Sequence, residues 1–318
     1  MELGTYTTAL GDRTLAEACA FLAERGVTRV ELACGGYPGR AHCDPEQLLD
    51  NAPAQRALLD LIHGHGMEIS ALSCHGNAVH PDPAEARRFD RDFTRAILLA
   101  RQLGVEVVNS FSGCPGGAPG DRTPNWTVCY WPEDFSRTLR YQWEDVLIPY
   151  WKEKAAFARD QGRKIALEMH PGFCVYNTST LLRLREAAGP EIGANFDPSH
   201  LIWQGMDPCV SIRALGRAGA IFHVHAKDTR IDPENCARNG VLDGTHYSRE
   251  LERPWNFRTV GYGHGEEYWR AILLELRRSG YDGAVSIEHE DPLMSRREGL
   301  EKAIACLLPL ILRDAPGN

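Results

Sequence analysis

Four short runs in the second half of the chain carry acids or imidazoles at alternating positions. The runs cover residues 164–170, 192–197, 221–225 and 284–290. If each run is a β-strand, alternation turns the following pairs to one side: Glu168 and His170, Asn195 and Asp197, His223 and His225, Glu288 and Glu290. Ionisable groups placed in this way are costly to bury unless they are paired or coordinated.

Three carboxylates and one imidazole that meet at one point would repel each other without a cation between them. A set of three oxygens and one nitrogen suits a fairly hard divalent ion, and we expect Mn²⁺, with Mg²⁺, Co²⁺ and Zn²⁺ as alternatives. Four protein ligands leave two octahedral positions for two substrate oxygens. A cation that chelates a carbonyl and a neighbouring hydroxyl makes the adjacent C–H more acidic, and a neutral imidazole can take that proton near pH 7.

The elements that must position these groups follow a regular alternation along the chain. We predict strands at 3–8, 29–33, 68–73, 106–111, 164–168, 192–197, 221–226 and 284–288. We predict helices at 15–25, 54–65, 84–103, 138–161, 179–187, 210–215, 266–279 and 296–312. Eight βα units predict a single (β/α)8 barrel domain over residues 1–318, of the α/β class. A doubly wound open sheet is the alternative, but residues 5–11 do not form a Gly-rich phosphate loop.

Two connections, 112–137 and 227–262, are unusually long and would lie on the rim where barrel active sites form. His75 and Asn109, at the ends of the third and fourth strands, are candidate substrate hydrogen-bonders, with a structural role at the rim as the alternative. Lys227 would neutralise an oxyanion or pair with Asp228, and His264 follows a Gly-Tyr-Gly turn near the eighth strand.

The composition limits the partners. The 318 residues contain 35 Lys and Arg against 43 Asp and Glu, so a net charge of −8 argues against nucleic acid. The sequence has no run of 18 apolar residues and no signal segment, so we expect a cytoplasmic protein that binds no membrane. The 10 cysteines contain no C-x-x-C pair, and we expect free thiols.

Four motifs at the strand ends resemble the sugar phosphate isomerase/epimerase family, which has a xylose-isomerase-like barrel. They read L-E-M-H-P at 167–171, F-D-P-S-H at 196–200, H-V-H-A-K-D at 223–228 and S-I-E-H-E-D at 286–291. The resemblance covers essentially the whole chain, and it implies that Glu168, Asp197, His223 and Glu288 bind the metal. It also places His200 beside the substrate. Family members that epimerise a ketose carry a second Glu six residues after the strand-five ligand, where this chain has Cys174.

A narrower resemblance is to the alpha subunit of the C-glycoside deglycosidases. It rests on the E-x-H pattern of 168–170 and on the stretches 73–77, 109–117 and 257–264. It implies a lyase in which His170 is the base beside the metal-bound Glu168 and Glu288. The ketone of a 3-oxo-glycoside would acidify the C2 proton, and the aglycone would leave from C1. It further implies a small beta subunit as a partner, and we also expect an oligomer.

Other interpretations of the function remain open at this point. The first is a sugar (ketose) isomerase or epimerase, which shares the proton abstraction. An endonuclease-IV-like phosphodiesterase would need a basic groove and further metal ligands, and a non-catalytic sugar-binding subunit would not need a complete ligand set. Trp126, Tyr130 and Trp131 would stack on an aglycone, anchor their loop or form a partner face.

Overall fold

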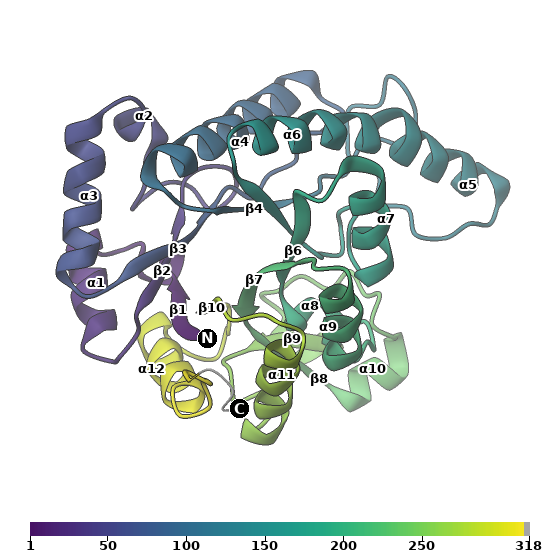
Figure 1. Ribbon diagram of the computed structural model, residues 1–318. Helices are drawn as coiled ribbons and strands as arrows, with labels where there is room; N and C mark the ends of the chain where they lie inside the picture. Colours follow the sequence, from purple (N-terminus) through teal and green to yellow (C-terminus); the bar gives the residue numbers. More distant parts are fainter. Residues whose placement is uncertain (315–318) are drawn as a thin grey trace.

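The computed structural model describes residues 1–314 and confirms the predicted (β/α)8 barrel (Figure 1). The closed barrel has the strand order β1-β10-β7-β6-β5-β4-β3-β2, and all neighbouring strands in it are parallel. Its strands are β1 (Glu2–Tyr6), β2 (Arg29–Ala33), β3 (Glu68–Ser73), β4 (Val107–Phe111), β5 (Lys164–Glu168), β6 (Ile192–Phe196), β7 (Ile221–Ala226) and β10 (Ala284–Ile287). Each lies within about two residues of its predicted bounds.

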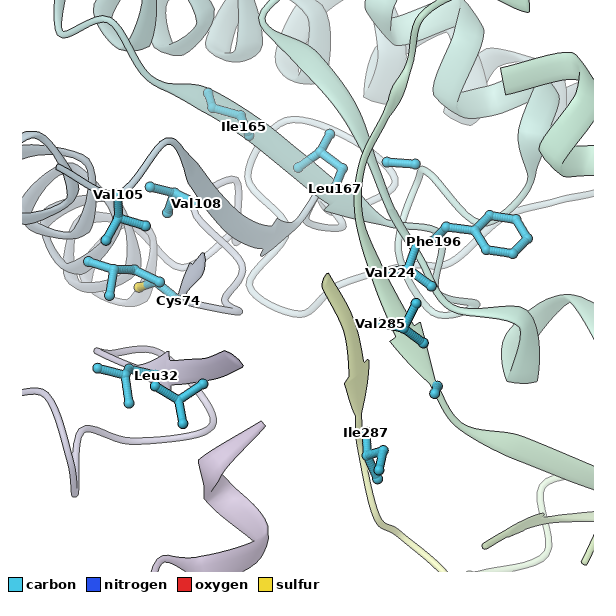
Figure 2. Close-up of a cluster of buried hydrophobic side chains, with 14 of the residues drawn as sticks. Leu32, Cys74, Val105, Val108, Ile165, Leu167, Phe196, Val224, Val285 and Ile287 are labelled. Carbon is cyan, nitrogen blue, oxygen red and sulfur yellow. The ribbon is translucent and has the colours of Figure 1, made fainter. Parts of the chain in front are cut away.

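The barrel forms because its strands carry apolar residues on the side that faces the helices. Ile165 and Leu167 of β5, Phe196 of β6, and Val285 and Ile287 of β10 are almost fully buried in one core between strands and helices (Figure 2). The alternate positions of the same strands face the barrel interior. The strand ends therefore bring polar side chains together inside the barrel.

The floor of the barrel is apolar and narrow. Phe222 packs against Ala71, Val107 and Ala166, and Gly193 is required beside it because a Cβ there would overlap the Phe222 ring. The register between β6 and β7 shifts at this point, so alternation along β7 is interrupted just before its two histidines.

The α-helices, apart from α10 in the connection after β7, are α1 (Leu15–Ala23), α2 (Pro45–Leu48), α3 (Ala52–Gly64), α4 (Pro83–Leu103), α5 (Glu133–Arg140), α6 (Ile148–Asp160), α7 (Thr178–Ala188), α8 (Pro198–Ile202), α9 (Pro208–Arg217), α11 (Glu266–Arg278) and α12 (Arg296–Leu307). The predicted helix 138–161 is in fact α5, a wide π-helical segment (Tyr141–Leu147) and α6. The wide turn comes just before Pro149, which has no backbone N–H to donate. The predicted helix 296–312 ends at Leu307, because Pro309 has no backbone N–H with which to continue the helical hydrogen bonds.

The two long connections follow β4 and β7, as predicted. The second one is more ordered than the sequence suggested, because β8 (Asp228–Ile231) and β9 (Trp255–Arg258) form an antiparallel pair, with α10 (Pro233–Asn239) between them. The first connection leads into α5, which projects away from the barrel (Figure 1).

Candidate metal and catalytic site

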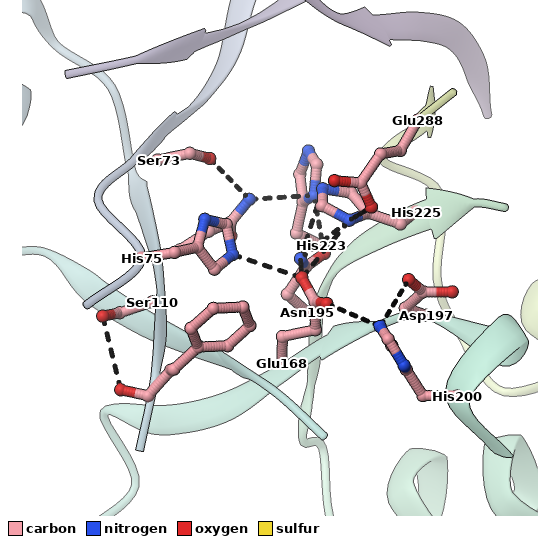
Figure 3. A network of polar contacts seen from close by, with 12 residues as sticks. Ser73, His75, Ser110, Glu168, Asn195, Asp197, His200, His223, His225 and Glu288 are labelled. Carbon is pink, nitrogen blue, oxygen red and sulfur yellow. Dashed lines mark hydrogen bonds and ion pairs between the residues drawn. The ribbon is translucent and has the colours of Figure 1, made fainter. Parts of the chain in front are cut away.

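Four side chains from neighbouring strand ends converge above the barrel interior (Figure 3). Ligand atoms of Glu168, Asp197, His225 and Glu288 all lie within 4.8 Å of one another. His225 Nδ1 is 3.1 Å from Glu288 Oε2 and 3.4 Å from Glu168 Oε2. Three of the four predicted ligands are thus brought together with a histidine.

That histidine is His225 and not His223, so the structure does not support His223 as the fourth ligand. His223 lies deeper in the barrel, where its Nδ1 is 3.0 Å from Asn195 Oδ1 and its Nε2 is 3.4 Å from Ser70 Oγ. Two residues of a strand span about 6.6 Å, so only one of two histidines on the same side can reach the carboxylates. Burial lowers the pKa of His223 to about 4, although Glu31 opposes the shift, and the ring is neutral at pH 7.

Glu31 of β2 is a site residue that the sequence analysis missed. It is fully buried, and its Oε1 accepts a hydrogen bond from Asn109 Nδ2 at 3.0 Å, while its Oε2 accepts one from Ser286 Oγ at 2.6 Å. Its carboxylate also lies 2.9 Å from His225 Nε2, so Nε2–H can donate to Glu31 and Nδ1 faces the other carboxylates. A carboxylate behind a histidine fixes the ring in this way in many metal sites. The signal in the sequence was a single acid between the apolar residues Val30 and Leu32.

Lys227 holds a positive charge within the carboxylate cluster. Its Nζ lies 3.0 Å from Asp197 Oδ2, 2.7 Å from Glu288 Oε2 and 3.1 Å from Glu290 Oε2. Although burial favours the neutral amine, these carboxylates raise the pKa of Lys227 well above its usual value. The ammonium group is therefore charged, but it faces more negative charges than it can neutralise.

The donor set fits a divalent cation. Asp197 Oδ1 accepts the backbone N–H of Ser199 at 2.8 Å at the start of α8, while the buried Oδ2 has only its ion-pair contacts with Lys227 and His200. Burial raises the pKa of Asp197 to about 7. The positive charge of Lys227 lowers this pKa, and the negative charge of Glu168 raises it further. Although burial also opposes ionisation of Glu168, hydrogen bonds from His200 and His75 hold the pKa of Glu168 well below its usual range. A cation held by Glu168, Asp197, His225 and Glu288 would offset this surplus of buried negative charge.

The cluster opens into a cavity of about 380 Å³, a size suited to a small metabolite. The cavity is lined by Tyr6, Thr8, Tyr37, Pro38, His75, Phe111, Glu168, His170, Phe173, Lys227, Glu288 and Glu290.

His170 has the properties of a general base. Its Nδ1 is 2.5 Å from the Pro171 carbonyl oxygen, so Nδ1 carries the hydrogen and Nε2 keeps its lone pair. Burial lowers the pKa of His170, although the nearby Glu168 opposes this shift. The imidazole is therefore neutral at pH 7.

The predicted substrate contacts divide into two groups. His75 and Lys227 line the cavity, and His200 lies against the cluster, with its Nε2 3.1 Å from Glu168 Oε1. Asn109 and His264 are not among the cavity-lining residues. Asn109 is buried below the cluster, where it contacts Glu31 and His223, because its strand position places it in the deeper layer.

His264 is tied to Asp228, with 2.8 Å between His264 Nδ1 and Asp228 Oδ1, and stacks on Tyr268. Cys174, at the position of the second Glu of ketose epimerases, is buried and does not line the cavity. In the loop after β4, Tyr130 and Trp131 are exposed, whereas Trp126 lies at a second cleft beside His170.

Two expectations from composition also have an outcome. All ten cysteines are free thiols, as predicted. Within residues 1–314, no helix combines the length and apolar character needed to cross a bilayer.

Comparisons with known proteins support the fold and the family. The chain is 38% identical over 312 residues to the uncharacterised protein YfiH of Bacillus subtilis, covering 96% of this chain and 98% of that one. It is 25% identical over 217 residues to an inosose dehydratase of Geobacillus thermodenitrificans, covering 67% and 65% of the two chains.

Two solved structures share the fold. The IolI protein with a bound zinc atom matches with a TM-score of 0.66 at 19% identity, over 98% of both chains. A D-tagatose 3-epimerase-like protein matches with a TM-score of 0.61 at 21% identity, also over 98% of both chains. A family model described as xylose isomerase-like TIM barrel matches residues 19–310. With a closed barrel and acid and histidine side chains at its strand ends, this chain belongs to the xylose isomerase-like TIM barrel family.

Proposed function

We propose that this protein is a divalent-metal-dependent enzyme that removes a proton from the carbon beside the carbonyl of a sugar or cyclic polyol ketone. One observation carries the proposal: a neutral His170 with a free Nε2 lines the same cavity as the cluster of Glu168 and Glu288. The names of the relatives, an inosose dehydratase and an epimerase-like protein, are consistent with this chemistry.

The residues of the chain divide the work between them. A divalent cation held by Glu168, Asp197, His225 and Glu288, for which we propose Mn²⁺ or Zn²⁺, would supply a Lewis acid for the carbonyl. His170 Nε2 takes the proton from the neighbouring carbon. Lys227 Nζ donates to the oxygen that becomes negative, and His75 lies where it can bind a hydroxyl group.

Aromatic side chains cover this part of the cavity. The rings of Phe111 and Phe173 stack with 4.3 Å between their centroids, and Phe111 lies 4.9 Å from the His170 ring. These rings limit the access of water to His170. A protonated imidazole in such surroundings keeps its proton long enough to return it to carbon.

Isomerisation is the outcome that we propose first. One base can move a proton between neighbouring carbons on a single face of the substrate, and His170 suffices for that. Epimerisation by two opposed bases has less support, because Cys174 replaces the second Glu and lies outside the cavity lining.

Elimination is the second candidate. It starts with the same proton transfer, and a leaving group β to the carbanion then departs with its bonding electrons. It needs no second base, and the relative named as a dehydratase favours it. In its specific form the leaving group is the aglycone of a 3-oxo-C-glycoside, and a small beta subunit would be a partner.

Proton exchange in deuterated water tests the proposal. Metal-loaded protein would be incubated with ketoses, inososes and a phenolic 3-oxo-C-glucoside, and ¹H NMR would follow the C–H beside the carbonyl. We expect exchange in the wild type, loss in His170→Ala, and no change in His63→Ala, which alters an exposed histidine on α3.

The products separate the two outcomes. A rearranged sugar that contains solvent deuterium indicates isomerisation, and release of water or aglycone indicates elimination. If metal-loaded protein neither exchanges a proton nor forms a product with any of these compounds, the proposed function is wrong and a sugar-binding subunit is favoured.

A further inference from the structure

A second cleft of about 390 Å³ lies beside the candidate active site and shares His170 with it. Its lining includes Trp126, Trp203, Leu242, Asp243, Tyr247 and Trp255. We propose that this cleft is a subsite for a planar aromatic group attached to the ketone-bearing part of the substrate. The inference rests on the proposed function, since it extends the substrate from the metal cluster past His170.

Two buried aromatic rings, those of Trp203 and Trp255, form a preformed wall behind the cleft, where they are 5% and 6% exposed. Trp203 and Trp255 stack with 4.5 Å between ring centroids and an angle of 5° between ring planes. Trp255 Nε1 donates to the carbonyl oxygen of Val241 at 3.1 Å, which ties β9 to the 241–247 segment. Tyr247 meets Trp255 edge to face at 6.2 Å. Because these rings already hold each other in place, a ligand ring would lose little free energy to ordering the wall.

The loop after β4 also contributes to the cleft. Trp126 Nε1 donates to the carbonyl oxygen of Phe173 at 3.0 Å, and the Trp126 ring meets Tyr176 edge to face at 5.6 Å. Phe173 itself lines the active-site cavity. The same loop contact therefore holds a wall of the cleft and a wall of the catalytic cavity.

The chemistry of the lining selects the ligand. Within the described residues the cleft contains neither Lys nor Arg in its lining, and its one acid is Asp243, so a phosphate or carboxylate group is disfavoured. Leu242 is 69% exposed and Tyr247 is 53% exposed, so apolar surface is available at the cleft. The half-exposed Tyr247 ring and the exposed Leu242 side chain therefore favour a flat aromatic ring.

The position of His170 gives the cleft a role in the reaction. A substrate that occupies both spaces places its carbonyl at the cluster, its acidic C–H at His170 and its aromatic group against the exposed side chains of Tyr247 and Leu242. Binding energy from the aromatic group would then fix the C–H at the base.

Binding of two simple glycosides tests the subsite without turnover. Phenyl β-D-glucoside and methyl β-D-glucoside would be titrated into metal-loaded protein and followed by calorimetry and saturation-transfer NMR. We expect the phenyl compound to bind about tenfold tighter, a difference typical of one well-packed ring. Equal affinities, or no binding of either compound, would overturn the proposal.

Two matched variants locate the binding site. Leu242→Asp places a carboxylate at the cleft on an exposed position, so the barrel is not disturbed, and we expect it to remove the preference for the phenyl compound. Leu251→Asp makes the same change at a position that is 88% exposed and outside the cleft, and we expect the preference to persist. An unchanged preference in Leu242→Asp would place the ring elsewhere and overturn the subsite.

The two hypotheses fail separately. Proton exchange on a ketose together with equal glucoside affinities rejects the aromatic subsite and keeps the proposed function. A phenyl preference that depends on Leu242, together with no proton exchange on any ketone, keeps the subsite and rejects the proposed function.

Discussion

Replacing Glu31 by glutamine should weaken divalent-metal binding although Glu31 is not a proposed ligand. The Glu31 carboxylate lies 2.9 Å from His225 Nε2, on the side of the ring opposite the carboxylate cluster. The negative charge holds the ring in place and makes Nδ1 a better donor to a cation. Glutamine has nearly the same shape but removes the charge, and its amide can orient the ring only as a neutral acceptor.

The expected magnitude follows from the role of such partners in metal sites. Loss of a partner behind a ligating histidine typically lowers affinity by about 10- to 100-fold, which corresponds to about 1.4–2.7 kcal/mol. The glutamine NH₂ must also face one of the donors that now surround the carboxylate, which include Asn109 Nδ2 and Ser286 Oγ. We therefore expect the free energy of unfolding to fall by about 1–3 kcal/mol as well, a loss that a barrel of this size should survive.

Competition with a chromogenic chelator measures the affinity for Mn²⁺ and Zn²⁺, and circular dichroism checks the fold. Glu68→Gln is the matched control, because Glu68 lies on the neighbouring strand β3 with its side chain 63% exposed in an ion pair with Arg29. We expect wild-type affinity in the control. If a folded Glu31→Gln variant binds metal as tightly as the control does, the orienting role of Glu31 is refuted.

Three further predictions follow from individual side chains. His225→Ala should abolish stoichiometric metal binding in equilibrium dialysis. His223→Ala should keep it, because His223 lies in the layer below the carboxylates. Loss of metal in His223→Ala alone would reverse this assignment. A maleimide at pH 8 should label the exposed Cys129 first and leave Cys43 unmodified in the folded protein. Burial raises the pKa of Cys43 to about 12, so that its side chain stays a thiol. Mass spectrometry identifies the labelled cysteines. Trp151→Ala should lower the free energy of unfolding in urea by about 3–5 kcal/mol, because Trp151 is 1% exposed and its indole N–H donates to a backbone carbonyl; a loss below 1 kcal/mol would contradict that packing.

The barrel could be predicted because its signal is repeated eight times. Short runs of apolar residues with strand character alternate with amphipathic segments, and the strand bounds at 29–33, 68–73, 164–168 and 221–226 agree with the structure residue by residue. Helix ends were less accurate where proline acts. The sequence places Pro149 and Pro309 inside otherwise helical patterns, and the structure responds with a wide turn before one and a helix end before the other.

The secondary structure within the connection after β7 could not be predicted from the sequence in the same way. β8 and β9 pair with each other across more than twenty residues, and neither Asp228–Ile231 nor Trp255–Arg258 has a turn beside it that would predict a hairpin. Their pairing depends on contacts that only the folded barrel provides, such as the stacking of Trp255 on Trp203.

At the site, alternation predicts the side of a strand but not the height above the barrel floor. Both His223 and His225 reach the interior. The shift of register beside Phe222 pairs His223 with Asn195, and Asn195 pairs with Glu168, so the strand register by itself does not select His225. Their partners distinguish them, because His223 contacts Asn195 while His225 lies between Glu31 and Glu288.

The interior is therefore built in two polar layers, and the lower one determines how the upper one binds metal. Asn109 and Glu31 belong to the lower layer, where they are fully buried and bonded to each other. Glu31 then fixes His225, which brings its Nδ1 to the carboxylates above. A search of the sequence for ligands alone finds the three carboxylates of the upper layer and overlooks Glu31, because a buried acid that orients a ligand carries no spacing signal of its own. The affinity of the Glu31→Gln variant measures this coupling between the layers directly, since the substitution leaves all four proposed ligands in the chain.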